Sequence, residues 1–312
     1  MDNKEKTFIS AVIYVHNAEK YIESYLKTII EVMESNFEHS EIICVNDSSE
    51  DDSLIKIKEV SESAAVTSIS VINMSYFHGL EIAMNAGVDM AIGDFVFEFD
   101  NTNLDFDAED IMRVYYHCLE GFDVVSASPS GKEKISSRLF YRVFDEFSVL
   151  PNRMNTESFR ILSRRVINRI SSMNKTIPYR KPIYASCGLK VDNLKYCENG
   201  EGYLNDKKEK QYKVGLAVDS LILFTEFGFK FSLIMTIIMM IVSVFMVFYS
   251  LAIYFTMHPV AGWTTTILFL SLAFFGLFGI LTIVIKYLQL LIDLVFKRKQ
   301  YSFECVEKIT KQ

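Results

Sequence analysis

Six polar or acidic residues follow a short apolar run near the middle of the first 200 residues, and they are the best candidates for a chemical site. The run Phe95–Phe99 has aromatic and β-branched residues around a single Glu98, which predicts a buried strand of a parallel sheet. Ligands of open α/β sheets bind at the carboxyl ends of such strands. Binding or catalysis is therefore expected at Asp100, Asn101, Thr102, Asn103, Asp105 and Asp107. The alternative is a loop that caps the next helix, with Asp107 as the N-cap.

Polar residues also end three strands predicted earlier in the chain, namely Asn17, Asp47 and Asn73. Because the carboxyl ends of parallel strands meet at one edge of a sheet, these side chains are expected near Asp100. Asp47 could accept a hydrogen bond from a base or a ribose, although an Asx-turn is common at such a position. The repetition at four strand ends is harder to explain by capping alone.

Strands and helices alternate through the first part of the chain. Apolar runs predict strands at 8–15, 41–45, 68–72, 95–99 and 123–127, and helical periodicity or capping signals predict helices at 18–33, 51–63, 80–91 and 111–119. This alternation is typical of a doubly wound, mostly parallel sheet of the α/β class.

Charge and cysteine usage exclude several classes of function. The formal net charge of −7 argues against nucleic acid as a main partner, because phosphate binding favours a basic face. The five cysteines show no Cys-x-x-Cys spacing, which indicates a reducing compartment without a disulfide framework or a zinc site.

The chain changes character after a first domain at 1–197. Residues 198–230 predict a charged linker and an amphipathic helix. Two uncharged segments, 231–255 and 264–285, are each long enough to span a ~30 Å hydrocarbon core, and the second has an alternative end at 296. Lysines flank this pair on its outer sides only, so the positive-inside rule places both termini, including the tail 297–312, in the cytoplasm.

Four sequence blocks and the C-terminal hairpin occur in an order found in a known family. The blocks are IYVHNAEKYIESYL, EIICVNDSSEDDS, HGLEIAMNAGVDMAIGDFVFEFD and FYRVFDEFSVLPNRMNTESFRILSRRVI. They resemble those of the family 2 glycosyltransferases, inverting enzymes that use nucleotide sugars and have a single GT-A domain. The most similar subgroup is the polyprenyl-phosphate glycosyltransferases.

The resemblance implies a GT-A (Rossmann-like), mostly parallel sheet, followed by an interface helix on the membrane and a two-helix transmembrane hairpin. It implies nucleotide-sugar contacts at Asn17, Asp47, Gly79 and Asp100, and catalytic roles for Asp100 and Arg160. The acceptor phosphate would bind Arg160 and Arg153. A Mg²⁺ or Mn²⁺ ion would bind Asp100, with Asp105 as a second candidate ligand.

Three positions depart from the family pattern. The family's Asp-x-Asp triplet, which holds a divalent cation on the nucleotide diphosphate, corresponds here to Asp100-Asn101-Thr102. Tyr76 stands where the family usually has an arginine, and Ser158 stands where it has an aspartate. One carboxylate is thus retained and two are lost at positions that the resemblance assigns to the site.

The resemblance therefore leads to one main functional hypothesis and two alternatives. The first is a multi-pass transferase of the cytoplasmic (inner) membrane that moves a sugar from a nucleotide donor, with UDP preferred, to a polyprenyl phosphate in cell-envelope polysaccharide synthesis. A second copy of the chain is a further candidate partner. One alternative is a catalytically inactive GT-A protein that binds nucleotide sugar or lipid and partners an active transferase or flippase. The other is a transferase to a sugar hydroxyl, with Asp105 or Asp107 as the base.

Overall fold

The computed structural model describes residues 4–62, 64–131, 156–172, 179–198, 215–219 and 303–308, with isolated positions elsewhere between 142 and 291. The chain forms two compact units. One comprises Met1–Asp145, Leu150–Leu216 and Lys297–Gln312, and the other comprises Glu146–Val149 and Ala217–Phe296. Every predicted site residue within the described ranges belongs to the first unit.

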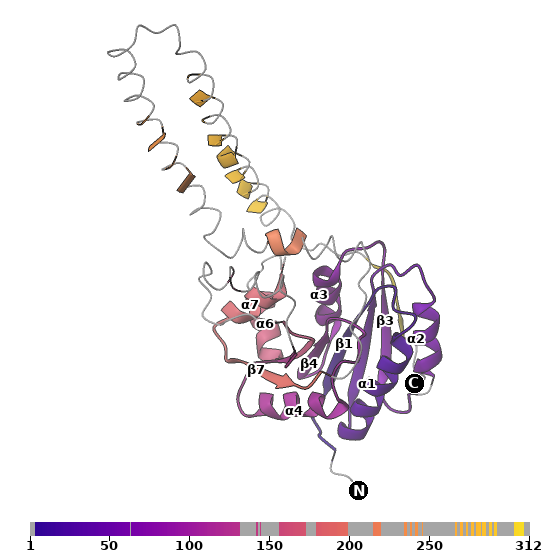
Figure 1. Ribbon diagram of the computed structural model, residues 1–312. Coiled ribbons are helices and arrows are strands. Elements are labelled where there is room, and N and C mark those ends of the chain that lie inside the picture. The colour runs from indigo at the N-terminus through magenta and orange to yellow at the C-terminus, as the bar shows by residue number, and fades with distance from the viewer. Residues whose placement is uncertain are drawn as a thin grey trace, which may run out of the picture. The chain divides into compact units, whose positions relative to one another are not determined.

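Among the described residues, the first unit contains an eight-stranded sheet with the order β7-β5-β6-β4-β1-β2-β3-β8 (Figure 1). The strands are Ile9–Val15 (β1), Ser40–Asn46 (β2), Ser68–Met74 (β3), Phe95–Phe99 (β4), Val124–Pro129 (β5), Phe159–Ser163 (β6), Val191–Tyr196 (β7) and Phe303–Lys308 (β8). The pairs β1–β2, β1–β4, β2–β3 and β5–β7 are parallel. Strand β6 is antiparallel to β4 and β5, and β8 is antiparallel to β3. The predicted mostly parallel α/β sheet is confirmed.

Helices cover both faces of this sheet. They are Ile22–Asn36 (α1), Ser53–Ser61 (α2), Leu80–Met90 (α3), Ala108–Leu119 (α4), Arg164–Ser172 (α6) and Arg180–Ser186 (α7). Buried side chains of α1, α2 and α4 share one core layer, and those of α3, α6 and α7 share the other. The sheet therefore separates two apolar layers, as expected for a doubly wound fold.

The alternation of side chains along β1 shows how the sequence supplies both layers. Ile13 and Val15 face the layer of α1, whereas Val12 and Tyr14 face that of α3, because successive side chains of a strand point to opposite faces. Helix α3 lies close to the sheet at Gly87, where an added Cβ would contact Val12 directly. A glycine at this position permits the close packing.

Three strands were not predicted from the sequence. Strands β6 and β7 complete the sheet beyond β4, and β8 comes from the segment predicted only as a cytoplasmic tail. The predicted helix ends are also shifted: α2 begins at Ser53 and α4 begins at Ala108. The chain thus returns to the edge of the sheet after residue 297.

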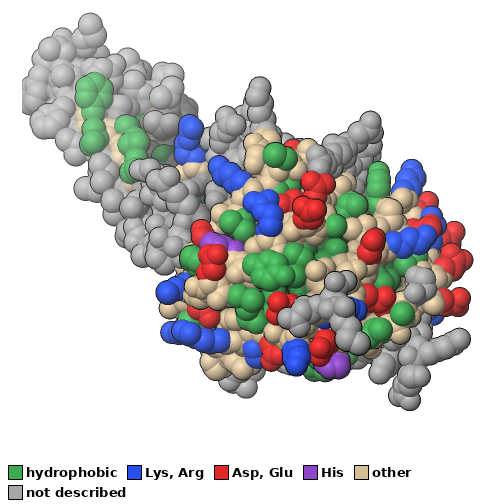
Figure 2. All heavy atoms as spheres, turned by 90° about the horizontal axis from the view of Figure 1, so that it is seen from below, with side chains coloured by type: hydrophobic (Ala, Val, Ile, Leu, Met, Phe, Trp, Pro, Cys, Tyr) green, Lys and Arg blue, Asp and Glu red, His purple; other side chains and the backbone are tan. Residues whose placement is uncertain are grey.

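The predicted transmembrane spans and most of the predicted interface helix lie outside the described residues, although 215–219 are helical. Within the part of the chain that the structure describes, no helix has both the length and the apolar character needed to cross a bilayer. Figure 2 shows one face of the molecule, on which acidic and basic side chains are interspersed around a group of hydrophobic ones. The coloured part of that face offers no broad surface of a single charge.

Candidate functional site

A buried network of charged side chains lies at the carboxyl end of β4. Glu98 and Asp100 are two residues apart, so they project from the same face of the strand. Arg160 of β6 lies opposite Glu98 in the antiparallel register. Its Nη1 donates to Glu98 at 2.6 Å, its Nη2 to Asp100 at 2.5 Å and its Nε to Glu157 at 3.0 Å. The predicted residues Asp100 and Arg160 are therefore in direct contact.

A second arginine, which the sequence did not indicate, reaches the same carboxylates from α7. The Arg180 Nη2 donates to the other oxygen of Asp100 at 2.8 Å, and its Nε donates to Glu81 of α3 at 2.9 Å. Its Nη1 lies 2.8 Å from Glu98, and the Tyr184 hydroxyl donates to that same carboxylate at 2.8 Å. Arg180 thus links α3, β4 and α7.

Both arginines are almost completely buried, so their charges act at short range in a medium of low polarity. Burial alone would raise the pKa of Asp100, but the charges of Arg160 and Arg180 outweigh it and hold that pKa well below its usual range. Burial would lower the pKa of Arg180, but its carboxylate neighbours, Glu81 first, raise it well above the ordinary value. Asp100, Arg160 and Arg180 are therefore ionised at neutral pH, and removing one of them would leave buried charges without a counterion.

The described side chains do not fit a resident divalent cation at Asp100. Among the described residues, no group of three His, Cys, Asp or Glu side chains could hold a metal. Both oxygens of Asp100 accept hydrogen bonds from guanidinium groups, whose positive charges would repel a cation. The Mg²⁺ or Mn²⁺ that the resemblance implies at Asp100 would have to displace one of them.

Asp105 and Asp107 occupy different environments. Asp107 is the N-cap of α4 and forms a capping box with Asp110, so the capping interpretation is confirmed for this residue. Asp105 accepts a hydrogen bond from the Ser158 hydroxyl at 3.2 Å, and the Tyr196 hydroxyl donates to Ser158 at 2.5 Å. Burial raises the pKa of the Asp105 carboxyl, and its Oδ1 has no hydrogen-bond partner within the described structure.

The predicted nucleotide-binding residues hold the neighbouring loops together. Asp47 is fully buried and accepts hydrogen bonds from the backbone N–H groups of His78 and Gly79, each at 2.8 Å, and from the Tyr14 hydroxyl at 3.1 Å. Gly79 precedes α3 with φ of 85°, a conformation that glycine adopts readily. A nucleotide contact through Asp47 would require the loop before α3 to move, and the role stays a prediction.

Asn17 ties together the loops after β1 and β2. It has φ of 48°, and its Oδ1 accepts a hydrogen bond from the backbone N–H of Glu50 at 2.9 Å. Its backbone N–H donates to the Ser49 hydroxyl at 3.1 Å. Asn17 therefore stabilises the edge of the sheet at which the candidate site lies, and its nucleotide contact also stays a prediction.

Two further arginines follow β6. Arg164 donates to the backbone oxygens of Ala91 and Gly93, whereas the side chain of Arg165 is 71% exposed. Arg153 lies outside the described residues.

The chain was compared with known protein families and curated proteins. Residues 10–169 match the model of glycosyl transferase family 2. An uncharacterized glycosyltransferase of Synechocystis is 29% identical over 188 residues, which are 58% of each chain. The uncharacterized glycosyltransferase YkcC of Bacillus subtilis is 25% identical over 86% of this chain and 84% of its own. A prophage bactoprenol glucosyl transferase homolog of Escherichia coli is 28% identical over 71% of this chain and 74% of its own.

Solved structures show the same fold. The mannosyltransferase PcManGT from Pyrobaculum calidifontis, solved in complex with GDP-Man and Mn²⁺, superposes with a TM-score of 0.51 over 70% of this chain and 63% of its own, at 10% identity. The mixed sheet described above is therefore a GT-A sheet. The family match covers about half of the chain, from β1 into α6. The chain belongs to glycosyl transferase family 2.

Proposed function

We propose that the chain is a membrane-anchored inverting glycosyltransferase that moves a sugar from a nucleotide donor, with UDP preferred, to a polyprenyl phosphate. The observation that carries this proposal is the charged network at the carboxyl end of β4, the kind of position at which open α/β sheets bind ligands, and it contains both predicted catalytic residues, Asp100 and Arg160. The relatives named bactoprenol glucosyl transferases support the lipid acceptor.

A phosphate acceptor suits the residues at this site. Its second pKa is about 6, so it is largely ionised at neutral pH, and a direct displacement needs no strong general base. The reaction instead needs positive charge near the departing nucleoside diphosphate. We assign the diphosphate contact to Lys181, a partly exposed residue of α7 whose positive charge also lowers the pKa of Asp100. This mechanism does not depend on a resident metal.

The course of the chain supports the proposed membrane hairpin. The sheet-containing unit ends at Leu216 and resumes at Lys297, and β8 then pairs with β3. If the intervening segment enters a bilayer, it must cross an even number of times, because both of its ends belong to one folded unit. Two crossings agree with the two uncharged segments 231–255 and 264–285 and with both termini on the cytoplasmic side.

The test is turnover by the full chain in detergent. Radiolabelled UDP-sugars and GDP-sugars are incubated with undecaprenyl phosphate, with Mn²⁺ or with EDTA. Label is expected in the lipid extract with at least one donor, and transfer is expected to persist in EDTA. Absence of lipid-linked label with every donor, from protein that still binds nucleotide, would contradict the proposal.

One alternative keeps specific support, namely a GT-A protein that binds nucleotide sugar or lipid without catalysis. Both oxygens of Asp100 are bonded to guanidinium groups, and Thr102 stands at the second carboxylate position of the family triplet. Such a protein would bind UDP-sugar or polyprenyl phosphate in calorimetry and show no turnover of any donor. Measurable transfer would exclude it.

A further inference from the structure

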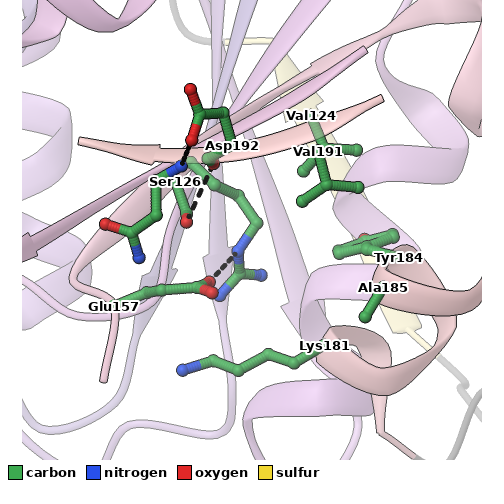
Figure 3. Close-up of a pocket in the computed structure, with 10 residues that line it drawn as sticks. Val124, Ser126, Glu157, Lys181, Tyr184, Ala185, Val191 and Asp192 are labelled. Atoms are coloured by element: carbon green, nitrogen blue, oxygen red, sulfur yellow. Dashed lines mark hydrogen bonds and ion pairs between the residues drawn. The ribbon is translucent and has the colours of Figure 1, made fainter. Parts of the chain in front are cut away.

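A cavity of about 170 Å³ lies against β5, β6 and β7, beneath α7 (Figure 3). Helix α7 contributes Lys181, Tyr184 and Ala185 to its lining, and Glu157 enters from the segment before β6. Its volume is close to that of an engineered cavity of ~150 Å³ that holds a benzene molecule. The cavity therefore has room for one six-membered ring.

The floor of this cavity is a polar row that crosses four strands. The register places Glu98 of β4 opposite Arg160 of β6, Arg160 opposite Ser126 of β5, and Ser126 beside Asn193 of β7. A sheet face covered by a helix is ordinarily apolar, and polar residues at such positions weaken packing unless they serve a function. The row thus indicates a binding surface rather than a packing layer.

One acceptor in the row has no partner. The Asn193 Nδ2 donates to the Ser128 hydroxyl at 2.7 Å, whereas the Asn193 Oδ1 is buried and has no hydrogen-bond partner within the described structure. Leaving a buried acceptor unsatisfied is unfavourable. A ligand that donates a hydrogen bond, such as a hydroxyl group, would satisfy it.

The charges around the cavity do not favour an anion. The cavity and the adjoining network contain five carboxylates and three cations, namely Glu81, Glu98, Asp100, Glu157 and Asp192 against Arg160, Arg180 and Lys181. The balance is −2, so a phosphate inside the cavity would meet no net positive charge. The remaining lining includes apolar side chains, Val124, Val191 and Ala185, which suit the C–H surface of a ring.

We propose that this cavity binds a single neutral sugar ring, with a ring hydroxyl donating to the Asn193 Oδ1. On the basis of the proposed function, this ring is the sugar that is transferred. Arg160 lines the cavity and also contacts Asp100, so the ring lies beside the end of β4. Lys181, which lines the same cavity, lies where a diphosphate attached to the ring would leave it.

Saturation-transfer NMR on the full chain in detergent tests the binding directly. The probes are methyl glucoside, methyl galactoside, methyl mannoside and methyl N-acetylglucosaminide, each with and without inorganic phosphate. Wild-type protein is expected to give saturation transfer to at least one probe. Two independent variants should reduce that signal about tenfold: Asn193→Leu removes the acceptor, and Ala185→Phe fills the space. Ala65→Phe is the matched control, because Ala65 is exposed and distant in the sequence from Ala185.

The outcomes separate the two proposals. Equal saturation transfer from wild type and from folded Ala185→Phe would overturn the sugar site, as would displacement of the sugar by inorganic phosphate. If the sugar binds and both variants lose it while no donor is turned over, the proposed function fails and the sugar site stands. With an active enzyme, the variants should raise the KM for the nucleotide sugar about tenfold and leave UDP affinity unchanged.

Discussion

The substitution Arg180→Met removes the guanidinium that links three elements of the first unit while keeping an unbranched side chain of similar length. Arg180 is fully buried, and its guanidinium contacts Glu81, Glu98 and Asp100. After the substitution, Glu98 and Asp100 keep Arg160 as a partner. Glu81 is buried and loses its guanidinium partner, so its charge becomes the main cause of the lower stability.

Removing one partner from a buried ion pair typically lowers the free energy of unfolding by about 3–5 kcal/mol, because the charge left behind stays buried. We expect Arg180→Met to fall in this range. The double variant Arg180→Met/Glu81→Leu should recover at least about 1 kcal/mol of that loss, because replacing both charges by apolar groups removes the buried carboxylate that has lost its guanidinium.

Pulse proteolysis of the full chain in detergent and urea measures the free energy of unfolding of the sheet-containing unit. The matched control is Lys27→Met, since the Lys27 and Glu23 side chains that form its ion pair are 57% and 51% exposed; exposed pairs contribute about 0–1 kcal/mol. A loss below about 1 kcal/mol for Arg180→Met, or a double variant less stable than the single one, would refute the structural role given to Arg180.

Three further predictions concern stability elsewhere in the first unit. The hydrogen bond to Asp192 raises the pKa of His117. The interaction therefore contributes its full stability below the unfolded pKa of about 6.5 and loses it as pH rises through the folded pKa. The urea midpoints of wild type and His117→Gln should differ more at about pH 6 than at about pH 9, and an equal difference at both would contradict this reasoning. Gly87→Ala should destabilise by about 1–3 kcal/mol, because the added Cβ meets Val12, and a stabilised variant in the same urea assay would show that α3 can shift. Asp107→Ala should cost about 1 kcal/mol through loss of the capping box and leave sugar transfer unchanged, so a lost activity in a stable variant would give Asp107 a catalytic role.

Strands β1, β2 and β4 could be predicted because each is largely an apolar run followed by polar residues, and β3 because polar and apolar residues alternate in it. Strand β6 could not, because Arg160 divides its apolar residues, and two of the three carboxylates that balance its charge, Glu98 and Asp100, are distant in the sequence. Strand β8 is a short segment of mixed polarity, FECVEK, whose pairing with β3 depends on a contact more than two hundred residues away. Such non-local pairing leaves no local signal.

The sequence likewise predicted some residues of the candidate site and missed others. Asp100 and Arg160 were found from the resemblance, and their contact agrees with a shared site. Arg180 and Glu81 lie in unremarkable local sequence, and only the fold brings them to Asp100. One signal was present, because Glu98 stands alone in an apolar run, and a buried carboxylate requires a cationic partner. That partner could be inferred, but its identity could not.

The most direct test of the proposed site is the initial rate of sugar transfer to undecaprenyl phosphate by Asp100→Asn. Asparagine has the shape of aspartate and can still accept a hydrogen bond, so melting temperature and UDP affinity serve as checks that the variant is folded. Because Asp100 holds the guanidinium groups of both Arg160 and Arg180 in place, kcat should fall by about 100-fold or more, the scale of losing one preorganised electrostatic contact. A folded Asp100→Asn protein that transfers sugar at the wild-type rate would contradict the assignment of the active site to the end of β4.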